Sequence, residues 1–98
     1  MFTLTAILRA KPGHEDKVKA ALLKVGAFAR EQEPDTAGFF VSQSAEDARV
    51  FVTHERFADQ AAMDRHNEGA GSKGFFAEAG DLLDGPVTVV TGPEIFEK

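Results

Sequence analysis

Apolar side chains recur at every second position over Phe2–Ala10. One set of alternating positions holds Phe2, Leu4, Ala6 and Leu8, and the other holds Thr3, Thr5, Ile7 and Arg9. A period of two directs the two sets to opposite faces of an extended chain, so a β-strand is predicted here. Lys11-Pro12-Gly13 ends this strand, because proline and glycine interrupt regular structure.

The pattern then changes to the period of an amphipathic helix, which we expect over about His14–Glu33. Its apolar stripe consists of Val18, Ala21, Leu22, Val25, Phe28 and Ala29. Glu15 and Asp16 lie in the first turn, where negative charge suits the positive end of the helix dipole. Pro34 and Gly38 bracket a loop after the helix.

Two stretches rich in aromatic and β-branched residues follow, Phe39–Ser44 and Arg49–Phe57, and both are predicted to be strands. Glu46-Asp47-Ala48 between them is typical of a hairpin turn. A second helix is expected over Asp59–Glu68, because the Asp59 side chain can accept hydrogen bonds from free N–H groups at a helix start.

The segment GAGSKG contains Gly69, Gly71 and Gly74 and is predicted to be a flexible joint between two short helices. It lacks the spacing of a phosphate-binding loop. Helical spacing resumes with Phe75, Phe76, Ala79, Leu82 and Leu83, and Gly85-Pro86 stops that helix. Val87–Thr91 is predicted to be the last strand, which Gly92-Pro93 breaks.

The element order β, α, β, β, α(α), β is that of the ferredoxin-like, split βαβ arrangement. We therefore expect an α+β fold with a four-stranded antiparallel sheet and helices on one face. The length of 98 residues fits one domain spanning 1–98.

The apolar residues of the predicted strands are not confined to one face. Ile7 lies on the threonine side of the first strand, and the adjacent Phe39 and Phe40 point to opposite faces. An exposed apolar sheet face usually marks an interface, so we predict a homodimer with two sheets packed face to face. Ile95 and Phe96 in the tail can then cross onto the partner.

Composition narrows the classes of partner. The net charge is −5, which argues against nucleic acid and anionic membranes as partners. There are no cysteines, which excludes disulfides and thiolate chemistry and is compatible with a cytoplasmic location. No apolar run approaches the roughly 20 residues of a membrane span, and no signal peptide is recognised.

His66 is the most informative candidate for chemistry. It shares one helix face with Ala62 and Met63, so it is expected to point inward. An imidazole titrates near neutral pH and can serve as a general base, although a buried structural histidine fits the same pattern. Glu55 can orient His66, accept a substrate proton, or pair structurally with an arginine. His54 is adjacent to Glu55 on a strand, so the two side chains face opposite sides.

We expect the substrate pocket to lie between sheet and helices. Its candidate residues are His54, Phe57, Met63, Phe75 and Phe76. The histidines are not spaced as metal ligands, and no metal site is predicted.

The run VFVTHERFADQAAMDRH, followed by KGFF and DLLDGP, resembles the antibiotic biosynthesis monooxygenase (ABM) family of dimeric α+β barrel proteins. Members typically carry an acidic residue in the third strand, an aromatic residue two positions on, and Asp, Ala and His in the next helix. The matching positions here are Glu55, Phe57, Asp59, Ala62 and His66. Lys11-Pro12-Gly13, Lys73, Phe75 and Gly85-Pro86 extend the resemblance over nearly the whole chain.

This resemblance implies that the chain is similar to oxygenases of phenols or quinols that need no cofactor. In such relatives the electron-rich substrate itself reduces O₂, and the protein supplies a dry pocket and a base. Other members degrade haem or isomerise small phosphorylated sugars or signalling molecules. Haem-degrading relatives carry Trp at His66, Asn at Ala6 and His near Ala77, and this chain has none of the three.

The expected activity is therefore a cofactor-independent monooxygenase acting on a small aromatic or quinol-like substrate, with His66 and Glu55 as catalytic residues. His54 replaces the Tyr that usually precedes the acidic residue, Phe57 replaces Trp or Tyr, and Gly71 replaces a second His. Two alternatives remain open, an isomerase or lyase of a small carbonyl metabolite and a non-catalytic dimeric binding module.

Overall fold

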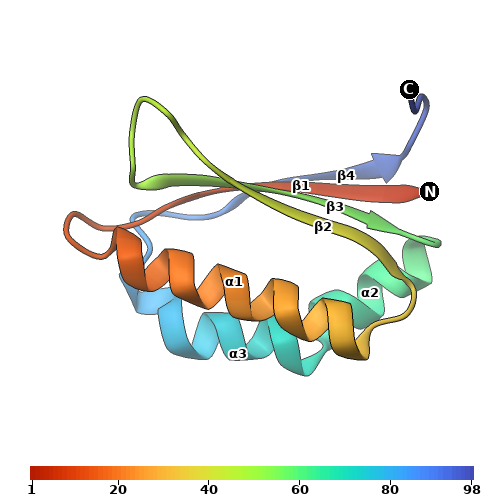
Figure 1. The fold of residues 1–98 in the computed structure, drawn as a ribbon, viewed down its shortest axis with the longest axis horizontal. Helices are drawn as coiled ribbons and strands as arrows, with labels where there is room; N and C mark the ends of the chain where they lie inside the picture. Colours follow the sequence, from red (N-terminus) through yellow and green to blue (C-terminus); the bar gives the residue numbers. More distant parts are fainter.

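The computed structural model describes residues 1–98 and shows an antiparallel sheet with all the α-helices on one of its faces (Figure 1). The elements are β1 Phe2–Arg9, α1 Glu15–Gln32, β2 Thr36–Gln43, β3 Val50–Phe57, α2 Gln60–Glu68, α3 Ala70–Ala79 and β4 Thr88–Pro93, with a short 3₁₀ turn at Gly80–Leu82. This order confirms the predicted ferredoxin-like α+β fold. No helix combines the length with the apolar character needed to cross a membrane.

The strands lie in the order β2-β3-β1-β4, so β3 and β1 are central. Leu4 of β1 pairs with Glu55 of β3, and Thr5 pairs with His54. Directly opposed residues of an antiparallel pair share a face. Leu4 and Glu55 therefore point toward the helices, and Thr5 and His54 point to the open face of the sheet.

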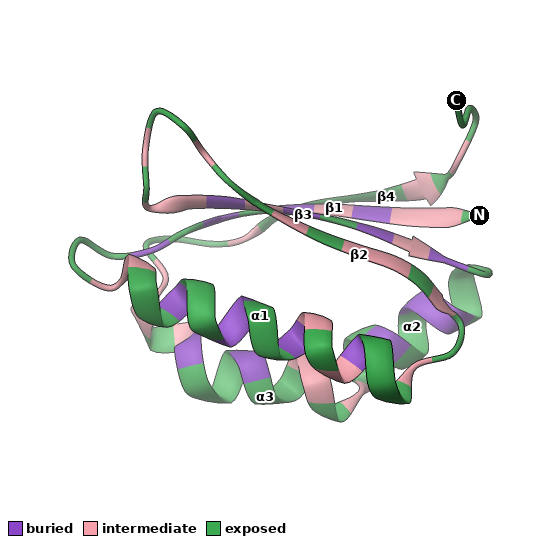
Figure 2. Ribbon diagram, in the orientation of Figure 1, coloured by how far each residue is buried: buried purple, intermediate pink, exposed green.

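The core lies between the sheet and the helices, where buried residues follow the sheet-facing side of α1 and α3 (Figure 2). Phe51, Phe57 and Val18 are its largest fully buried side chains. The predicted stripe of α1 forms its helical side, except that Phe28 is only partly buried. Each alternate β1 residue from Leu4 to Leu8 is buried in turn, as the period of two predicts.

Strand β2 begins at Thr36, three residues before the predicted start at Phe39. Thr36 pairs with Phe57 and Gly38 with Arg56, so the register shifts between Thr36 and Gly38. Such an irregularity is a β-bulge, and glycine commonly occupies one. The prediction took Gly38 for a loop residue because a bulge breaks the alternation that identifies a strand.

The prediction of a flexible glycine joint over GAGSKG is wrong. Helix α3 begins at Ala70, directly after α2, and includes Gly71 and Gly74. A Cβ atom added at Gly71 would lie 2.8 Å from Cδ1 of Phe28 on α1. Position 71 therefore requires glycine because α1 and α3 approach each other closely there. This contact joins residues that are distant in sequence.

The last elements also differ from the predicted bounds. Helix α3 ends at Ala79, and the chain continues through the 3₁₀ turn to Gly85, whose positive φ of 86° suits glycine. Strand β4 spans Thr88–Pro93 rather than Val87–Thr91. Pro93 can pair with Phe2 because β4 is an edge strand, where a missing N–H is tolerated.

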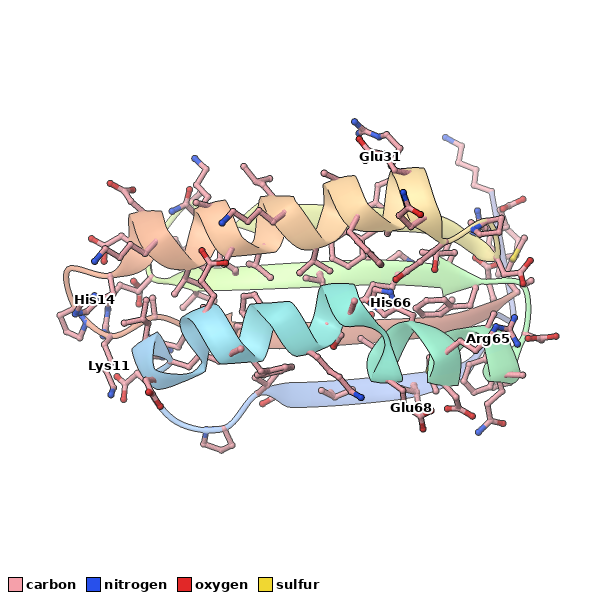
Figure 3. All side chains as sticks on the ribbon, turned by 90° about the horizontal axis from the view of Figure 1, so that it is seen from below. Lys11, His14, Glu31, Arg65, His66 and Glu68 are labelled. Carbon is pink, nitrogen blue, oxygen red and sulfur yellow. The ribbon has the colours of Figure 1, made fainter.

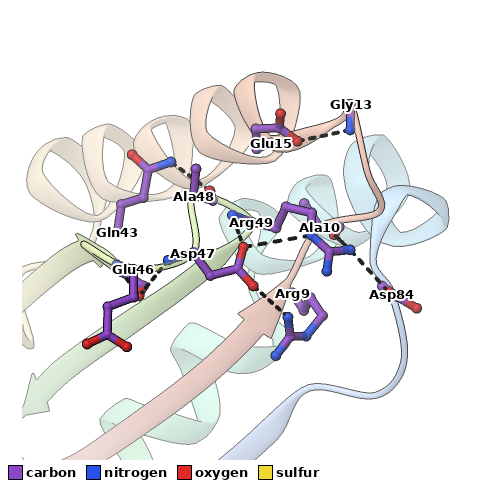
Figure 4. Close-up of polar contacts among 11 residues, drawn as sticks. Arg9, Ala10, Gly13, Glu15, Gln43, Glu46, Asp47, Ala48, Arg49 and Asp84 are labelled. Carbon is purple, nitrogen blue, oxygen red and sulfur yellow. Dashed lines mark hydrogen bonds and ion pairs between the residues drawn. The ribbon is translucent and has the colours of Figure 1, made fainter.

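Charged side chains fix the hairpin turn to neighbouring segments (Figure 4). Asp47 lies 2.8 Å from Arg9 at the end of β1 and 3.7 Å from Arg49, which lies 3.5 Å from Asp84. The hydrogen bond from the Arg49 backbone N–H, together with both arginines, lowers the pKa of Asp47. The antiparallel pairing of β2 with β3 confirms the predicted hairpin, and these surface contacts each contribute little to stability.

The open face of the sheet carries exposed apolar side chains. Ile7, Phe40 and Val90 lie there with 47%, 57% and 67% of their surface exposed. Ile95 and Phe96 in the tail after β4 are also exposed. The helices leave this face uncovered, as Figure 1 shows.

Replacement of Asp59 by alanine is expected to destabilise the protein by about 1 kcal/mol, because the Asp59 carboxylate accepts a hydrogen bond from the Ala62 N–H at 2.8 Å. Urea denaturation of Asp59→Ala measures the loss. Asp64→Ala changes an exposed residue of the same helix and is the matched control. Equal stabilities of the two variants would contradict this capping role.

Candidate active site

Helix α2 places His66 under the sheet. Asp59 caps the start of the helix, and Ala62, Met63 and His66 are its buried residues. His66 follows Met63 by three positions and Ala62 by four, so its side chain shares the helix face that packs on the sheet. His66 is only 4% exposed, and Figure 3 shows it between α1 and α2. The prediction of an inward-pointing His66 is confirmed.

The imidazole of His66 lies between two carboxylates from different elements. Its Nδ1 is 2.6 Å from Oε1 of Glu33, the C-cap residue that follows the last residue of α1. Its Nε2 is 3.1 Å from Oε1 of Glu55 on β3. The ring of His66 on α2 therefore contacts both the end of α1 and the central strand β3, and it links these three elements.

Glu55 is 5% exposed, and its two carboxylate oxygens have different surroundings. Oε2 accepts a hydrogen bond of 2.7 Å from the hydroxyl of Thr53, two residues earlier on the same face of β3. Oε1 is close to His66 Nε2, but their orientation is not that of a well-aligned hydrogen bond. Oε1 is therefore the oxygen that retains free capacity to accept a proton.

Phenyl rings confine the imidazole. The centroid of Phe57 lies 5.3 Å from that of His66, and the centroid of Phe39 lies 5.8 Å away, both with tilted planes. These rings exclude water from the contacts of His66, which strengthens its attraction to Glu33 and Glu55.

The surroundings of His66 shift its pKa in two directions. Burial lowers the pKa, because a low-dielectric interior disfavours the charged imidazolium. The carboxylates of Glu55 and Glu33 raise it, and their combined effect exceeds that of burial. The pKa of His66 is therefore above its ordinary value of 6.5, and the ring remains protonated to higher pH than a free histidine.

A cavity of about 270 Å³ lies between the sheet and the helices and contacts both Glu55 and His66. Ten of its fifteen lining residues are apolar, and none is lysine or arginine. Its apolar walls include Leu4, Ala6 and Leu8 from β1, Leu22 and Val25 from α1, and Phe75 from α3. Its polar lining consists of Thr53, Glu55, His66, Asn67 and Ser72. The Glu55–His66 pair thus lies at the wall of a largely apolar space.

The predicted pocket residues occupy three different places. Phe75 and Phe76 line the cavity. Phe57 and Met63 are buried in the core, where Phe57 packs against His66, but they do not line the cavity. His54 lies on the open face, with Nδ1 3.2 Å from the Thr5 hydroxyl and its ring stacked on Phe40. This corrects its assignment to the pocket, because it points away from Glu55.

Sequence analysis missed Glu33 and Thr53. Glu33 follows Ala29 by four positions, so the buried stripe of α1, continued by one turn, leads to this carboxylate. Thr53 lies on the buried face of β3, at every second position with Phe51 and Glu55. Both signals were present in the periodicities, but a glutamate at a helix end usually lies in solvent. Glu33 and Glu55 contact opposite nitrogens of the His66 ring, and no group of three or more histidine, aspartate or glutamate side chains is arranged to hold a metal ion.

Comparison with known proteins identifies relatives of the whole chain. A family model described as antibiotic biosynthesis monooxygenase, ABM, matches residues 1–78. YcnE from Bacillus subtilis (strain 168), whose name groups it with the monooxygenases and gives no substrate, is 30% identical over 90 residues. The match covers 92% of this chain and 94% of YcnE.

Solved structures share the fold of this chain. NE2512 from Nitrosomonas europaea, described as a protein of unknown function, is 26% identical, with a TM-score of 0.87 over 99% of this chain and 91% of its own. PA3566 from Pseudomonas aeruginosa is 25% identical, with a TM-score of 0.86 over 97% of this chain and 94% of its own.

The raised pKa of His66 predicts a pH-dependent contribution to stability. Below the unfolded pKa of 6.5 the ring is protonated in both states and the ion pairs contribute fully. As the pH rises through the folded pKa, this contribution is lost. The stability advantage of wild type over His66→Gln should therefore decrease with rising pH above neutrality in urea denaturation, and His54→Gln is the control. An advantage that did not change with pH would contradict the prediction.

Proposed function

The chain belongs to the antibiotic biosynthesis monooxygenase family, and we propose that it is a cofactor-independent monooxygenase of a small aromatic or quinol-like substrate. The observation that carries the proposal is the buried Glu55–His66 pair, 3.1 Å apart, at the wall of the apolar cavity. A substrate in this cavity would have a proton acceptor beside it and little competing water.

The lining favours a neutral aromatic molecule. Apolar side chains dominate the walls, and Phe75 and Phe76 offer ring surfaces for an aromatic substrate. The absence of lysine and arginine from the lining disfavours a phosphorylated substrate, which needs cationic partners. A hydroxyl group that reaches Glu55 is the feature that would fix the orientation of the bound ring.

Glu55 would act as the base of this reaction. Its Oε1 has no aligned hydrogen bond and can accept the proton of a phenolic or enolic hydroxyl. His66, whose pKa the two carboxylates raise, would support Glu55 as an imidazolium, because a ring protonated on both nitrogens donates and cannot accept a proton. This division of roles differs from the expectation from sequence, in which His66 itself was the candidate base.

The electrons would come from the substrate. Deprotonation creates an electron-rich anion, and a new bond forms between one of its carbons and O₂. Cleavage of the O–O bond leaves one oxygen on that carbon as a carbonyl and releases the other as water. A CH₂ group that becomes C=O loses two hydrogens and four electrons, and O₂ accepts both, so no external reductant is needed. The protein would contribute the base, the orientation and the exclusion of solvent.

The same pair of residues also supports the alternative of an isomerase or lyase. Glu55 and His66 can move a proton next to a carbonyl without any oxygen, since general acid–base chemistry needs only a positioned donor and acceptor. Consumption of O₂ separates the two enzymes. A binding module is less well supported, because a simple structural role does not need a cavity at a buried Glu–His pair.

Replacement of Glu55 by glutamine is expected to reduce the rate of oxygen uptake with a responsive phenol or quinol by about 10²- to 10⁴-fold. The amide of the glutamine would preserve the shape of the side chain and its contact with Thr53 but could not hold a proton. An oxygen electrode and a panel of phenols and quinols provide the measurement. Glu68→Gln makes the same chemical change at an exposed position of α2 and should behave as wild type (Figure 3). Full activity of Glu55→Gln would refute its role as base.

We also propose that the protein works as a homodimer joined through the open sheet face. Ile7, Phe40 and Val90 give this face an exposed apolar surface, which a second copy would cover. Light scattering should then give twice the chain mass of 10.6 kDa at micromolar concentration. Val90→Lys places a charge in the apolar surface and should shift the protein toward a monomer, whereas Lys73→Ala on α3 should not. A monomeric wild type would rule out this arrangement.

A further inference from the structure

The partly buried carboxylate of Glu33 has no part in the reaction proposed above. Glu33 contacts His66 Nδ1 at 2.6 Å, whereas Glu55 contacts Nε2. The two carboxylates therefore lie at the two nitrogens of one ring. The hydroxyl of Thr36 donates a hydrogen bond of 2.9 Å to the same oxygen of Glu33, which fixes this side chain in its orientation toward the ring.

The outer side of this cluster is a second hollow. It has a volume of about 300 Å³ and is lined by Glu33 and His66 together with Phe28, Asp35, Arg65 and Gly69. Glu33 does not line the cavity that Glu55 faces, whereas His66 lines both spaces. The imidazole thus forms the partition between an inner cavity and an outer hollow.

Exposure decreases from the outer hollow inward. The side chain of Glu33 is 14% exposed, and those of His66 and Glu55 are 4% and 7% exposed. Arg65 and Asp35 at the outer hollow pair with each other at 2.8 Å. Water therefore reaches the three-residue cluster more readily at Glu33 than at the other two groups.

We propose that Glu33 is the outer end of a proton relay, through which the buried Glu55–His66 pair exchanges protons with solvent. The use of this relay in turnover rests on the proposed function, but the path can be measured without a substrate. Glu33 acts through His66 and does not touch the cavity, so it is a positioning residue.

The relay keeps the charge of the cluster constant. When Glu55 takes a proton from the substrate, the Nδ1 proton of His66 passes to Glu33, which releases it to water in the outer hollow. The carboxyl group of Glu55 is then neutral beside a neutral imidazole, and Glu33 is ionised again. One proton has entered the cluster and one has left, so the net charge of its three side chains is the same before and after the transfer, and the proton of the substrate has in effect reached solvent. The reverse sequence returns a proton when water forms from the reduced oxygen.

The test measures exchange of the His66 ring N–H protons with water by ¹⁵N-detected NMR, in the ligand-free protein. Glu33→Gln should slow this exchange by about 10²-fold, the lower range of what a positioned proton-transfer group supplies. Glu31→Gln makes the same change two residues earlier, at an exposed position on the outer side of α1 (Figure 3), and should leave the rate at the wild-type value. Wild-type exchange in folded Glu33→Gln would overturn the relay.

A rescue experiment separates proton transfer from support of the structure. Glu33→Ala opens space at the outer hollow, and sodium formate should restore the exchange rate in this variant, because formate replaces a carboxylate. Failure of formate to restore exchange in the folded variant would overturn the relay.

Oxygen uptake in the same proteins separates the two proposals. Glu33→Gln should slow uptake, and formate should restore it to Glu33→Ala. If wild type consumed no oxygen with any substrate of the panel while its proton exchange still depended on Glu33, the oxygenase assignment would fail and the relay would stand.

Discussion

The structure depends on one buried charge arrangement, an imidazole held between two carboxylates. A lone ion in this position would be expensive to bury, and removal of His66 would leave two carboxylates without a compensating charge. The arrangement is possible because His66, Glu33 and Glu55 come from three elements that the fold brings together. The apolar core around Phe57 and Phe39 then strengthens their attraction by excluding water. Packing and chemistry therefore support each other in this part of the molecule.

The alternation of residues along β3 separates two sets of side chains. Glu55 lies on the helix face with the cavity, and the neighbouring His54 lies on the open face with Phe40. One face thus has a buried acid–base pair, and the other has an apolar surface with a histidine stacked on a phenyl ring. Because the period of a strand is two, a shift of pairing by one residue would interchange these contents. The position of Glu55 at the cavity therefore depends on the register of β3 against β1, as the pairing of the sheet does.

Local patterns in the sequence were enough to predict the fold and part of the site. The alternation in β1, the Asp59 cap and the spacing of His66 from Met63 depend on near neighbours, and the structure confirms each. Glu33 was missed because its burial arises where the end of α1 meets α2, a contact across 33 residues. The glycines of α3 were misassigned for a similar reason. Gly71 is needed because Phe28 on another helix leaves no room for a side chain, whereas a prediction from local helix propensity interprets a glycine as a flexible residue.

This contact between Gly71 and Phe28 has a consequence for the breadth of compounds that the fold can accommodate. Helix α3 carries Phe75 and Phe76, which line the cavity. It can lie close to α1 because position 71 has no side chain to contact Phe28. A bulkier residue there would act as a spacer between the helices and lift that roof away from the sheet. Substitution at this single position, remote from Glu55 and His66, would thereby change the size of molecule that the cavity admits and leave the Glu55–His66 pair in place.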